Sequence, residues 1–308
     1  MRLPAFAILL FTAAFTLTAQ VTGSAPRPQR PIPAVEHVLI IIVDGLRPDV
    51  LLLAEAPTLH ALARGGAYSF WARTTDVAVT LPSCTSMLTG VSPRIHGVTW
   101  NSDLPAGKQV YPLVPTVFEL ATRAGYVTAL VAGKSKFAAL NQPGTITHAY
   151  VPATTKVSDE QVTAEAVKVI AAYQPALLCV HYPDVDGAGH AKGWGSREQL
   201  SQISRTDAQI GLLLGALERA GIRGSTVVLV SADHGGAGRS HGANDLRSRY
   251  IPWIVAGPGV RPGYDLTQAG GLQVTTEDTC ATVCWLLGLP PQPYFDGHPV
   301  TAAFEPGL

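Results

Sequence analysis

Three apolar stretches of the chain are each followed by residues that can bind a metal ion or move a proton. The stretches are HVLIIIV, PALLCVHY and STVVLVSA, and the residues that follow them are Asp44, Asp184, Asp186, His190, Asp233, His234 and His241. Single members have ordinary explanations, because an aspartate before a glycine is usually a turn residue. An Asp-His pair directly after a fully apolar stretch is harder to explain, since buried ionisable groups need partners.

Carboxylates and imidazoles that converge with few lysines or arginines among them require a cation. Oxygen and nitrogen ligands without thiolates suit zinc or a similar divalent ion. Six candidate ligands are too many for one tetrahedral ion and about right for two; they are Asp44, Asp186, His190, Asp233, His234 and His241. The residue types therefore predict a centre for two divalent ions, with zinc as the favoured metal.

A second chemical candidate is Thr80 in VTLPSCTSMLTG, residues 79–90. A threonine that opens a helix commonly caps it, and Pro82 suits a first helical turn. A free threonine hydroxyl is a poor nucleophile, but a metal ion can lower its pKa and orient it. By itself the stretch favours the cap, so the role of Thr80 depends on its neighbours.

The elements that must position these residues alternate along the chain. Apolar runs predict strands at residues 37–43, 126–133, 175–182, 225–232 and 250–260. Amphipathic segments predict helices at residues 56–66, 116–125, 158–173, 196–221 and 275–289. This alternation predicts an α/β fold, with a mostly parallel central sheet flanked by helices on both faces. Ligands of such sheets bind outside the carboxyl ends of the strands, where the aspartates and histidines fall.

Composition indicates one compact domain over residues 35–308. The chain has 308 residues, of which 47% are hydrophobic and 14% charged, enough for a sizeable core. Its formal net charge is zero, which argues against a nucleic-acid-binding surface. The four cysteines lack the spacing of a zinc site, so they are packing residues or form one bridge. They are Cys84, Cys179, Cys280 and Cys284.

The start of the chain is typical of an export signal. Arg2 precedes an apolar run with small residues near Ala19, which predicts a signal peptide over residues 1–19 and a Pro-rich linker over residues 20–34. The run is short for a membrane span, although an uncleaved anchor is the alternative. We expect a periplasmic or secreted protein with no other membrane segment.

Four stretches taken together resemble the alkaline-phosphatase superfamily. They are VDGLRPD, TLPSCTSMLTGVSPRIHGVTWN, DGAGHAKGWGS and ADHGG followed by SHG. The type I phosphodiesterase/nucleotide pyrophosphatase branch is the most similar, and the resemblance runs from about Val38 to the last predicted helix. It implies an alkaline-phosphatase-like catalytic domain that acts on a small phosphate ester.

The resemblance also implies roles for individual residues. One metal ion would be held by Asp44, Asp233 and His234 together with Thr80, and the other by Asp186, His190 and His241. Asn101 would hydrogen-bond a phosphoryl oxygen. The backbone N–H of Leu81 is a second candidate donor, because it lies at a predicted helix N-terminus.

The chain departs from that branch at the last histidine, which there comes far downstream. Here His241 follows His234 by only seven residues, and this compact arrangement resembles ethanolamine-phosphate transferase domains of the same superfamily. His298 in FDGHPV is the reserve candidate. The remaining histidines considered are expected to be structural or surface residues, and they are His60, His96, His148 and His181.

These expectations favour Thr80 as a nucleophile. A sulfatase is disfavoured, because Thr80-Leu81-Pro82-Ser83-Cys84 lacks both the convertible first residue and the arginine of the sulfatase pattern. The predicted activity is hydrolysis of phosphoric esters through a phosphothreonine intermediate. Two alternatives are a transferase that passes the phosphoryl group to an alcohol, and a secreted metal-binding module without catalysis. The second alternative needs neither Thr80 nor Asn101.

The sequence leaves the substrate and the oligomeric state open. Residues 101–115 are expected to line the substrate pocket. Trp100 or Tyr111 either stacks on a nucleobase there or simply packs against the protein.

Overall fold

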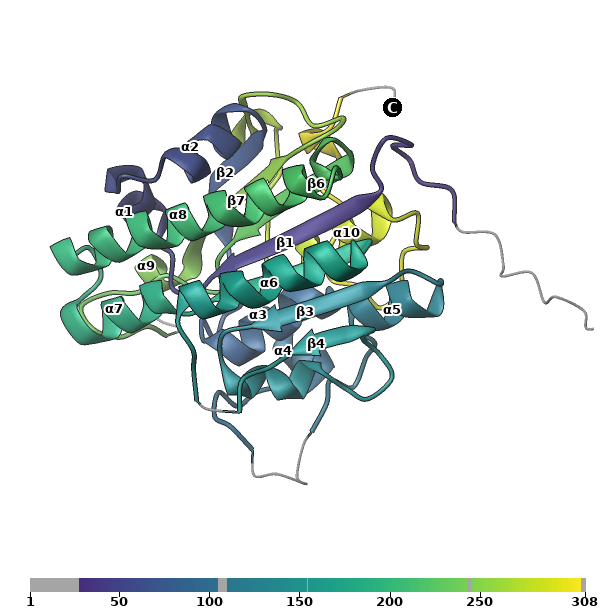
Figure 1. The fold of residues 1–308 in the computed structure, drawn as a ribbon. Helices are drawn as coiled ribbons and strands as arrows, with labels where there is room; N and C mark the ends of the chain where they lie inside the picture. Colours follow the sequence, from purple (N-terminus) through teal and green to yellow (C-terminus); the bar gives the residue numbers. More distant parts are fainter. Residues whose placement is uncertain (1–27, 105–109, 154, 243–244, 306–308) are drawn as a thin grey trace, which may run out of the picture.

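The computed structural model describes residues 28–104, 110–153, 155–242 and 245–305 (Figure 1). The predicted signal peptide and residues 20–27 of the predicted linker lie outside the described residues. Within these ranges, eight strands form one sheet in the order β4-β3-β5-β1-β6-β7-β2-β8. In chain order they are β1 (His37–Val43), β2 (Ala67–Arg73), β3 (Thr128–Ala132), β4 (His148–Tyr150), β5 (Leu177–Tyr182), β6 (Thr226–Ser231), β7 (Tyr250–Ala256) and β8 (Tyr264–Asp265).

The centre of the sheet is parallel. β4, β3, β5, β1 and β6 all run in one direction, whereas β7 is antiparallel to both β6 and β2. Every residue of β3, β5 and β6 is buried, which fits their runs of apolar residues because helices cover parallel strands on both faces. The predicted mostly parallel α/β sheet is therefore confirmed.

Helices pack on both faces of this sheet, as predicted. α2 (Pro57–Arg64), α6 (Asp159–Tyr173) and α8 (Arg197–Arg219) pack together on one face. α3 (Thr80–Thr89), α5 (Val117–Arg123) and α10 (Asp278–Leu286) pack together on the other (Figure 1). The shorter helical elements are α1 (Pro48–Leu53), α4 (Pro93–His96), η1 (Ser135–Leu140), α7 (Asp184–Lys192), η2 (Arg223–Ser225), α9 (Leu246–Arg249), η3 (Leu266–Gln268) and η4 (Thr301–Ala303).

Ser158 and Gln161 have the spacing of a capping box, and so do Ser196 and Gln199, but the two pairs behave differently. At the start of α6, Ser158 and Gln161 each bond the other's backbone N–H, as expected. At the start of α8, Ser196 Oγ accepts the N–H of Gln199, but the Gln199 side chain accepts the N–H of Gly195. At α8 the glutamine side chain therefore accepts the N–H of Gly195, the residue before the cap, in place of the N–H of Ser196.

The order of the central strands determines which residues meet at the carboxyl edge of the sheet. β3, β5, β1 and β6 are neighbours, and their register places Val43 of β1 beside Tyr182 of β5 and Ile42 beside Ser231 of β6. Segments that are far apart in the sequence therefore end side by side.

Gly45 forms the turn that follows β1 at this edge of the sheet. Its φ is +73°, and a Cβ here would lie 3.0 Å from the Cα of Asp186. Its N–H donates to Asp233 Oδ1 at 3.1 Å, so it links the end of β1 to the end of β6. A larger residue would be both strained and crowded at this position.

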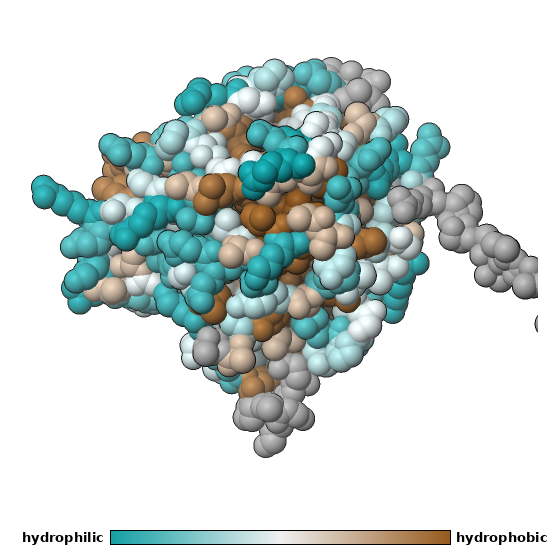
Figure 2. All heavy atoms as spheres, viewed as in Figure 1, coloured by the Kyte–Doolittle hydropathy of each residue, from teal (hydrophilic) through white to brown (hydrophobic). Residues whose placement is uncertain are grey.

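The four cysteines are buried free thiols, so they are packing residues. None of the helices in the described ranges combines the length and apolar character that a membrane span requires. On the face shown in Figure 2, hydrophilic side chains are interspersed with smaller apolar areas.

Candidate metal centre

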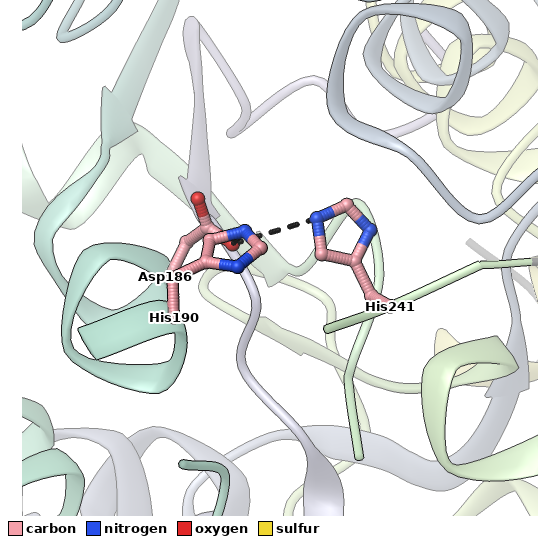
Figure 3. A group of neighbouring side chains, drawn as sticks. All are labelled: Asp186, His190 and His241. Carbon is pink, nitrogen blue, oxygen red and sulfur yellow. Dashed lines mark ion pairs between the residues drawn. The ribbon is translucent and has the colours of Figure 1, made fainter. Parts of the chain in front are cut away.

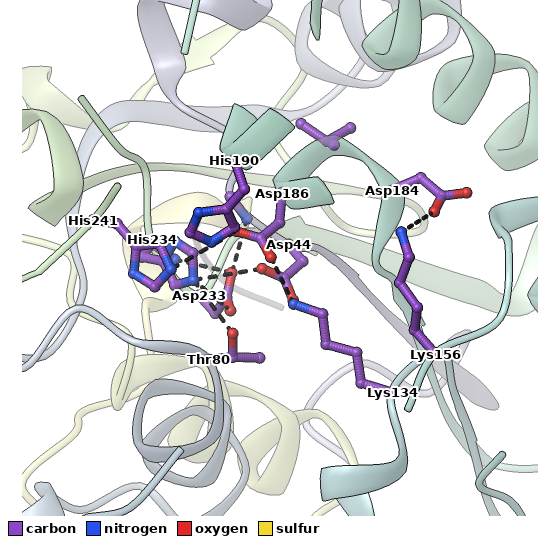
Figure 4. A network of polar contacts seen from close by, with 12 residues as sticks. Asp44, Thr80, Lys134, Lys156, Asp184, Asp186, His190, Asp233, His234 and His241 are labelled. Carbon is purple, nitrogen blue, oxygen red and sulfur yellow. Dashed lines mark hydrogen bonds and ion pairs between the residues drawn. The ribbon is translucent and has the colours of Figure 1, made fainter. Parts of the chain in front are cut away.

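The predicted ligands meet at the carboxyl edge of the sheet (Figure 4). Asp44 directly follows β1, and Asp233 and His234 follow β6 after one intervening residue. Asp186 and His190 lie one turn apart on α7, which follows β5. His241 lies in the segment after β6.

The ligand atoms form two overlapping groups. Those of Asp186, His190 and His241 lie within 4.8 Å of one another (Figure 3), and so do those of Asp44, Asp186 and His234. Asp186 therefore belongs to both groups, whereas the resemblance places it in one. Asp233 stays close to the second group, with its Oδ2 3.3 Å from His234 Nε2.

All three histidines are held in the tautomer that suits a metal ligand. Nδ1 of His190, His234 and His241 lies 2.9–3.0 Å from a backbone carbonyl oxygen. A carbonyl only accepts, so Nδ1 carries the proton and the lone pair of Nε2 faces the carboxylates. This arrangement of ring nitrogens is typical of histidines that bind metal ions.

The carboxylates present unsatisfied oxygens on the same side. Asp44 Oδ1, Asp186 Oδ1 and Asp233 Oδ2 are buried without a hydrogen-bond partner. Asp44 Oδ1 lies 3.4 Å from His234 Nε2, and Asp186 Oδ1 lies 3.3 Å from His190 Nε2. Buried oxygens of this kind are costly unless something binds them. The residues present therefore fit divalent metal ions.

Two residues of the centre were not predicted as part of it. Lys134, two residues after β3, places Nζ 2.7 Å from both Asp44 Oδ2 and Asp186 Oδ2. His181 of β5 contacts the same Asp44 oxygen at 3.0 Å through Nε2, and its ring packs against Phe137. The chain thus supplies one cation of its own between two carboxylates.

The charges of this network shift its pKa values in opposite directions. Burial alone would raise the pKa of Asp44, but Lys134, His181 and His234 hold it well below its usual range. The pKa of Asp233 is raised well above its usual value by burial and by the charge of Asp44. Burial lowers the pKa of His234, and burial together with His234 lowers that of His241 to about 4. Both rings are therefore neutral at pH 7, as metal ligands must be.

Thr80 lies beside this network. It is the first residue of α3, a helix in which every residue is buried, and its Oγ1 is 3.4 Å from His234 Nε2. The preceding residue, Val79, occupies the cap position, and no side chain caps the helix. The interpretation of Thr80 as a helix cap is therefore wrong, and its hydroxyl faces the aspartates and histidines instead.

Asn101 lies at the N-terminus of the same helix. Its Oδ1 accepts the N–H of Leu81 at 2.9 Å and the ammonium group of Lys136 at 3.2 Å. The Leu81 N–H, expected to be a free donor, is therefore engaged by Asn101. With two donors on Oδ1, the amide NH₂ is the part of Asn101 that remains for a ligand.

Other predicted candidates lie elsewhere. His298 is exposed and lines a separate cavity with Trp285 and Phe295, so the structure brings His241, not His298, to the cluster. Trp100 is half-buried against the core, and Tyr111 is also half-buried. His60, His96 and His148 contact Leu51, Ser86 and Tyr173 respectively.

Together, the sheet and the ligand cluster at its edge define a protein of the alkaline-phosphatase superfamily. The pattern of the type I phosphodiesterase/nucleotide pyrophosphatase family matches residues 38–244. The chain belongs to this family, which is metal-dependent.

Similarity to individual proteins agrees with this assignment. The chain is 28% identical over 277 residues to the catalytic subunit of human GPI ethanolamine phosphate transferase 2, covering 84% of this chain and 27% of that protein. It is 26% identical over 219 residues to human ectonucleotide pyrophosphatase/phosphodiesterase family member 5, covering 66% and 45% respectively. The chain thus spans less than half the length of either relative.

The fold matches a solved structure of an inactive variant of murine ectonucleotide pyrophosphatase/phosphodiesterase 5, which is in complex with AMP. The TM-score is 0.75 at 16% identity, covering 88% of this chain and all of that one. At this identity the likeness establishes the fold.

Proposed function

We propose that this protein is a metal-dependent hydrolase of small phosphoric esters with Thr80 as its nucleophile. The observation that carries the proposal is the position of Thr80, whose hydroxyl lies 3.4 Å from His234 Nε2 within a set of unsatisfied carboxylate oxygens. A module that only binds metal needs no hydroxyl there.

Two divalent ions, most simply zinc, fit the donor set. We assign Asp44, Asp233 and His234 with Thr80 to one ion, and Asp186, His190 and His241 to the other. When bound, such ions lower the pKa of a hydroxyl group and neutralise charge on a transferring phosphoryl group.

The side chains then divide the reaction between them. A bond forms between Thr80 Oγ1 and phosphorus while the bond to the leaving oxygen breaks, which gives a phosphothreonine. Water then displaces Thr80 and restores its hydroxyl group. The released product is inorganic phosphate when the substrate is a monoester, and a phosphate monoester when the substrate is a diester. The amide NH₂ of Asn101 donates to a non-bridging oxygen, and the N–H of Leu81 joins it if Asn101 releases that N–H on substrate binding.

The test uses the purified chain with zinc and nitrophenyl mono- and diesters. We expect turnover that chelation abolishes and added zinc restores, and a phosphorylated Thr80 in rapidly quenched reactions analysed by mass spectrometry. Turnover that survives chelation, or phosphate found on another residue, would contradict the proposal.

A transferase is the second candidate, because the chain is similar over 84% of its length to a GPI ethanolamine phosphate transferase. The same phosphothreonine would then pass its group to an alcohol in place of water. Product analysis with added ethanolamine, glycerol or methanol separates the two activities. Transfer that exceeds hydrolysis at millimolar alcohol would favour the transferase.

We also infer export, from the apolar start of the chain. Secretion with cleavage near residue 19 predicts a mature protein that begins near residue 20. N-terminal sequencing of the protein from culture medium or periplasm tests this, and an intact Met1 in that fraction would contradict cleavage.

A further inference from the structure

Trp194 packs against two of the proposed metal-binding histidines. Its ring centroid lies 5.2 Å from that of His190 and 5.9 Å from that of His241, and the ring planes are inclined at 85° and 67°. These distances and angles are typical of edge-to-face aromatic pairs. The two histidines come from different elements, α7 and the segment after β6 (Figure 3), so a single side chain contacts both.

The indole of Trp194 is held by three segments that leave room for it. A Cβ at Gly45, Gly189 or Gly236 would lie 3.2, 2.8 or 2.3 Å from an atom of the indole ring. The indole N–H donates to the backbone oxygen of Gly45 at 2.8 Å. Because only 8% of the residue is exposed, the ring is fixed in place and anchored to the turn that follows β1.

The backbone of Trp194 also holds the segment that carries His241. Its N–H donates to the backbone oxygen of Gly238 at 2.8 Å. The next residue of that segment, Arg239, accepts a hydrogen bond from His190 Nδ1 at 3.0 Å. The position of this segment relative to α7 therefore depends in part on Trp194.

The two proposed ions differ in how much their ligands need such support. The aspartates and the histidine assigned to the first ion are fully buried and follow β1 and β6, and the sheet pairs both of these strands on each side. By contrast, the side chain of His190 is 46% exposed, and His241 lies in an irregular segment beyond the end of β6. The second set of ligands therefore gains most from a rigid neighbour.

We propose that Trp194 is a positioning residue for the second metal site, where it holds the imidazoles of His190 and His241 in the orientation that binds an ion together with Asp186. This inference rests on the proposed function. If Trp194 only filled space, its replacement would lower stability and leave the two metal affinities in the same ratio. The ratio of the two affinities is therefore the diagnostic quantity.

The test titrates the metal-free protein with zinc in competition with a chromophoric chelator, which resolves the two binding steps. Trp194→Phe keeps an aromatic ring and removes the indole N–H. We expect one step to weaken roughly 10- to 100-fold, the range for residues that support metal ligands, and the other to change only a few-fold.

Trp253→Phe is the matched control. Trp253 is also buried, and its indole N–H donates to Thr279 Oγ1 at 3.0 Å. Both variants lose a buried indole hydrogen bond, so both should melt below the parent. Only Trp194→Phe should change the ratio of the two zinc affinities.

His241→Ala identifies the affected step, because it removes a ligand of the second ion alone. Adding Trp194→Phe to His241→Ala should leave the affinity for the remaining ion unchanged, since the site that Trp194 supports is already lost. Two unchanged affinities in Trp194→Phe, equal weakening of both, or a further loss in the double variant would overturn the proposal.

The titration needs no turnover, so it separates this inference from the proposed function. A parent that binds two zinc ions and hydrolyses no ester contradicts the proposed function, while the affinity ratio still decides the role of Trp194. A parent with fewer than two binding steps would overturn both.

Discussion

Replacement of Lys134 by methionine tests whether the centre is a set of carboxylates in need of cations. The Lys134 ammonium group is buried and lies 2.7 Å from an oxygen of Asp44 and from one of Asp186. Burial would lower the pKa of Lys134, but these two carboxylates raise it, so it is charged at neutral pH. Lys134→Met keeps much of the side-chain volume and removes that charge.

The expected magnitude follows from the loss of a buried ion-pair partner. Removing one member of such a pair costs about 3–5 kcal/mol, because the remaining charges stay buried without compensation. For a domain of this size, each kcal/mol shifts Tm by roughly 2–4 °C, so the metal-free variant should melt roughly 6–20 °C below the parent. Zinc should recover much of this loss, because it gives the same carboxylates a new counter-charge.

Thermal unfolding of both proteins in chelator and in excess zinc measures this directly. Lys168→Met is the control, since Lys168 is exposed and its ion pair with Glu165 should be worth under about 1 kcal/mol. Equal melting of parent and variant in chelator would refute the reasoning. So would a deficit that zinc leaves unchanged, because the lysine would then stabilise something other than a metal centre.

Three further predictions follow from the site and its surroundings. Thr80→Ala should lower kcat by orders of magnitude while elemental analysis finds the metal content of the parent; a variant as active as the parent removes Thr80 from the mechanism. His241→Ala should lose one of two bound ions and His298→Ala neither, and the reverse result would reassign the last ligand. Burial and the nearby charge of Asp184 raise the pKa of Asp159 to about 7. Between about pH 4 and pH 7 the folded state therefore keeps a proton that the unfolded state has lost, so the free energy of unfolding should fall as the pH rises through this range. Asp159→Asn should flatten this fall, and above pH 7 its Tm should be higher than that of the parent. A Tm profile that runs parallel to that of the parent from pH 5 to 8 would contradict the assigned protonation.

The parts of the fold that the sequence predicts are those with strong apolar patterns. β1, β5 and β6 are runs of branched apolar residues, and each is followed by its aspartates and histidines. β2, β4 and β8 were not predicted. β4 and β8 are only three and two residues long and are only partly buried, so local pattern gives little signal.

The candidate site also contains residues that the sequence identifies and residues that it does not. Asp44, Asp186, Asp233 and their histidines stand out because ionisable residues directly follow apolar strands. Lys134 gives no such signal, since a lysine after Gly133 is typical of a solvated turn. Its place between two carboxylates depends on β3 lying beside β5, which is a property of strand order.

His181 and Lys136 escaped prediction for a related reason. His181 is one residue within a fully buried strand, and it becomes informative only when the register puts it beside the end of β1. Lys136 depends on Asn101, 35 residues earlier in the chain, being brought to the N-terminus of α3. In both cases the partner is supplied by tertiary structure.

Metal content tests the central claim most directly. The purified chain should be loaded with zinc, dialysed against metal-free buffer and measured by elemental analysis beside a combined Asp44→Asn, Asp186→Asn variant. We expect two equivalents of divalent metal in the parent and a marked loss in the variant. A parent that retains no divalent metal, or a variant that retains as much as the parent, would contradict it.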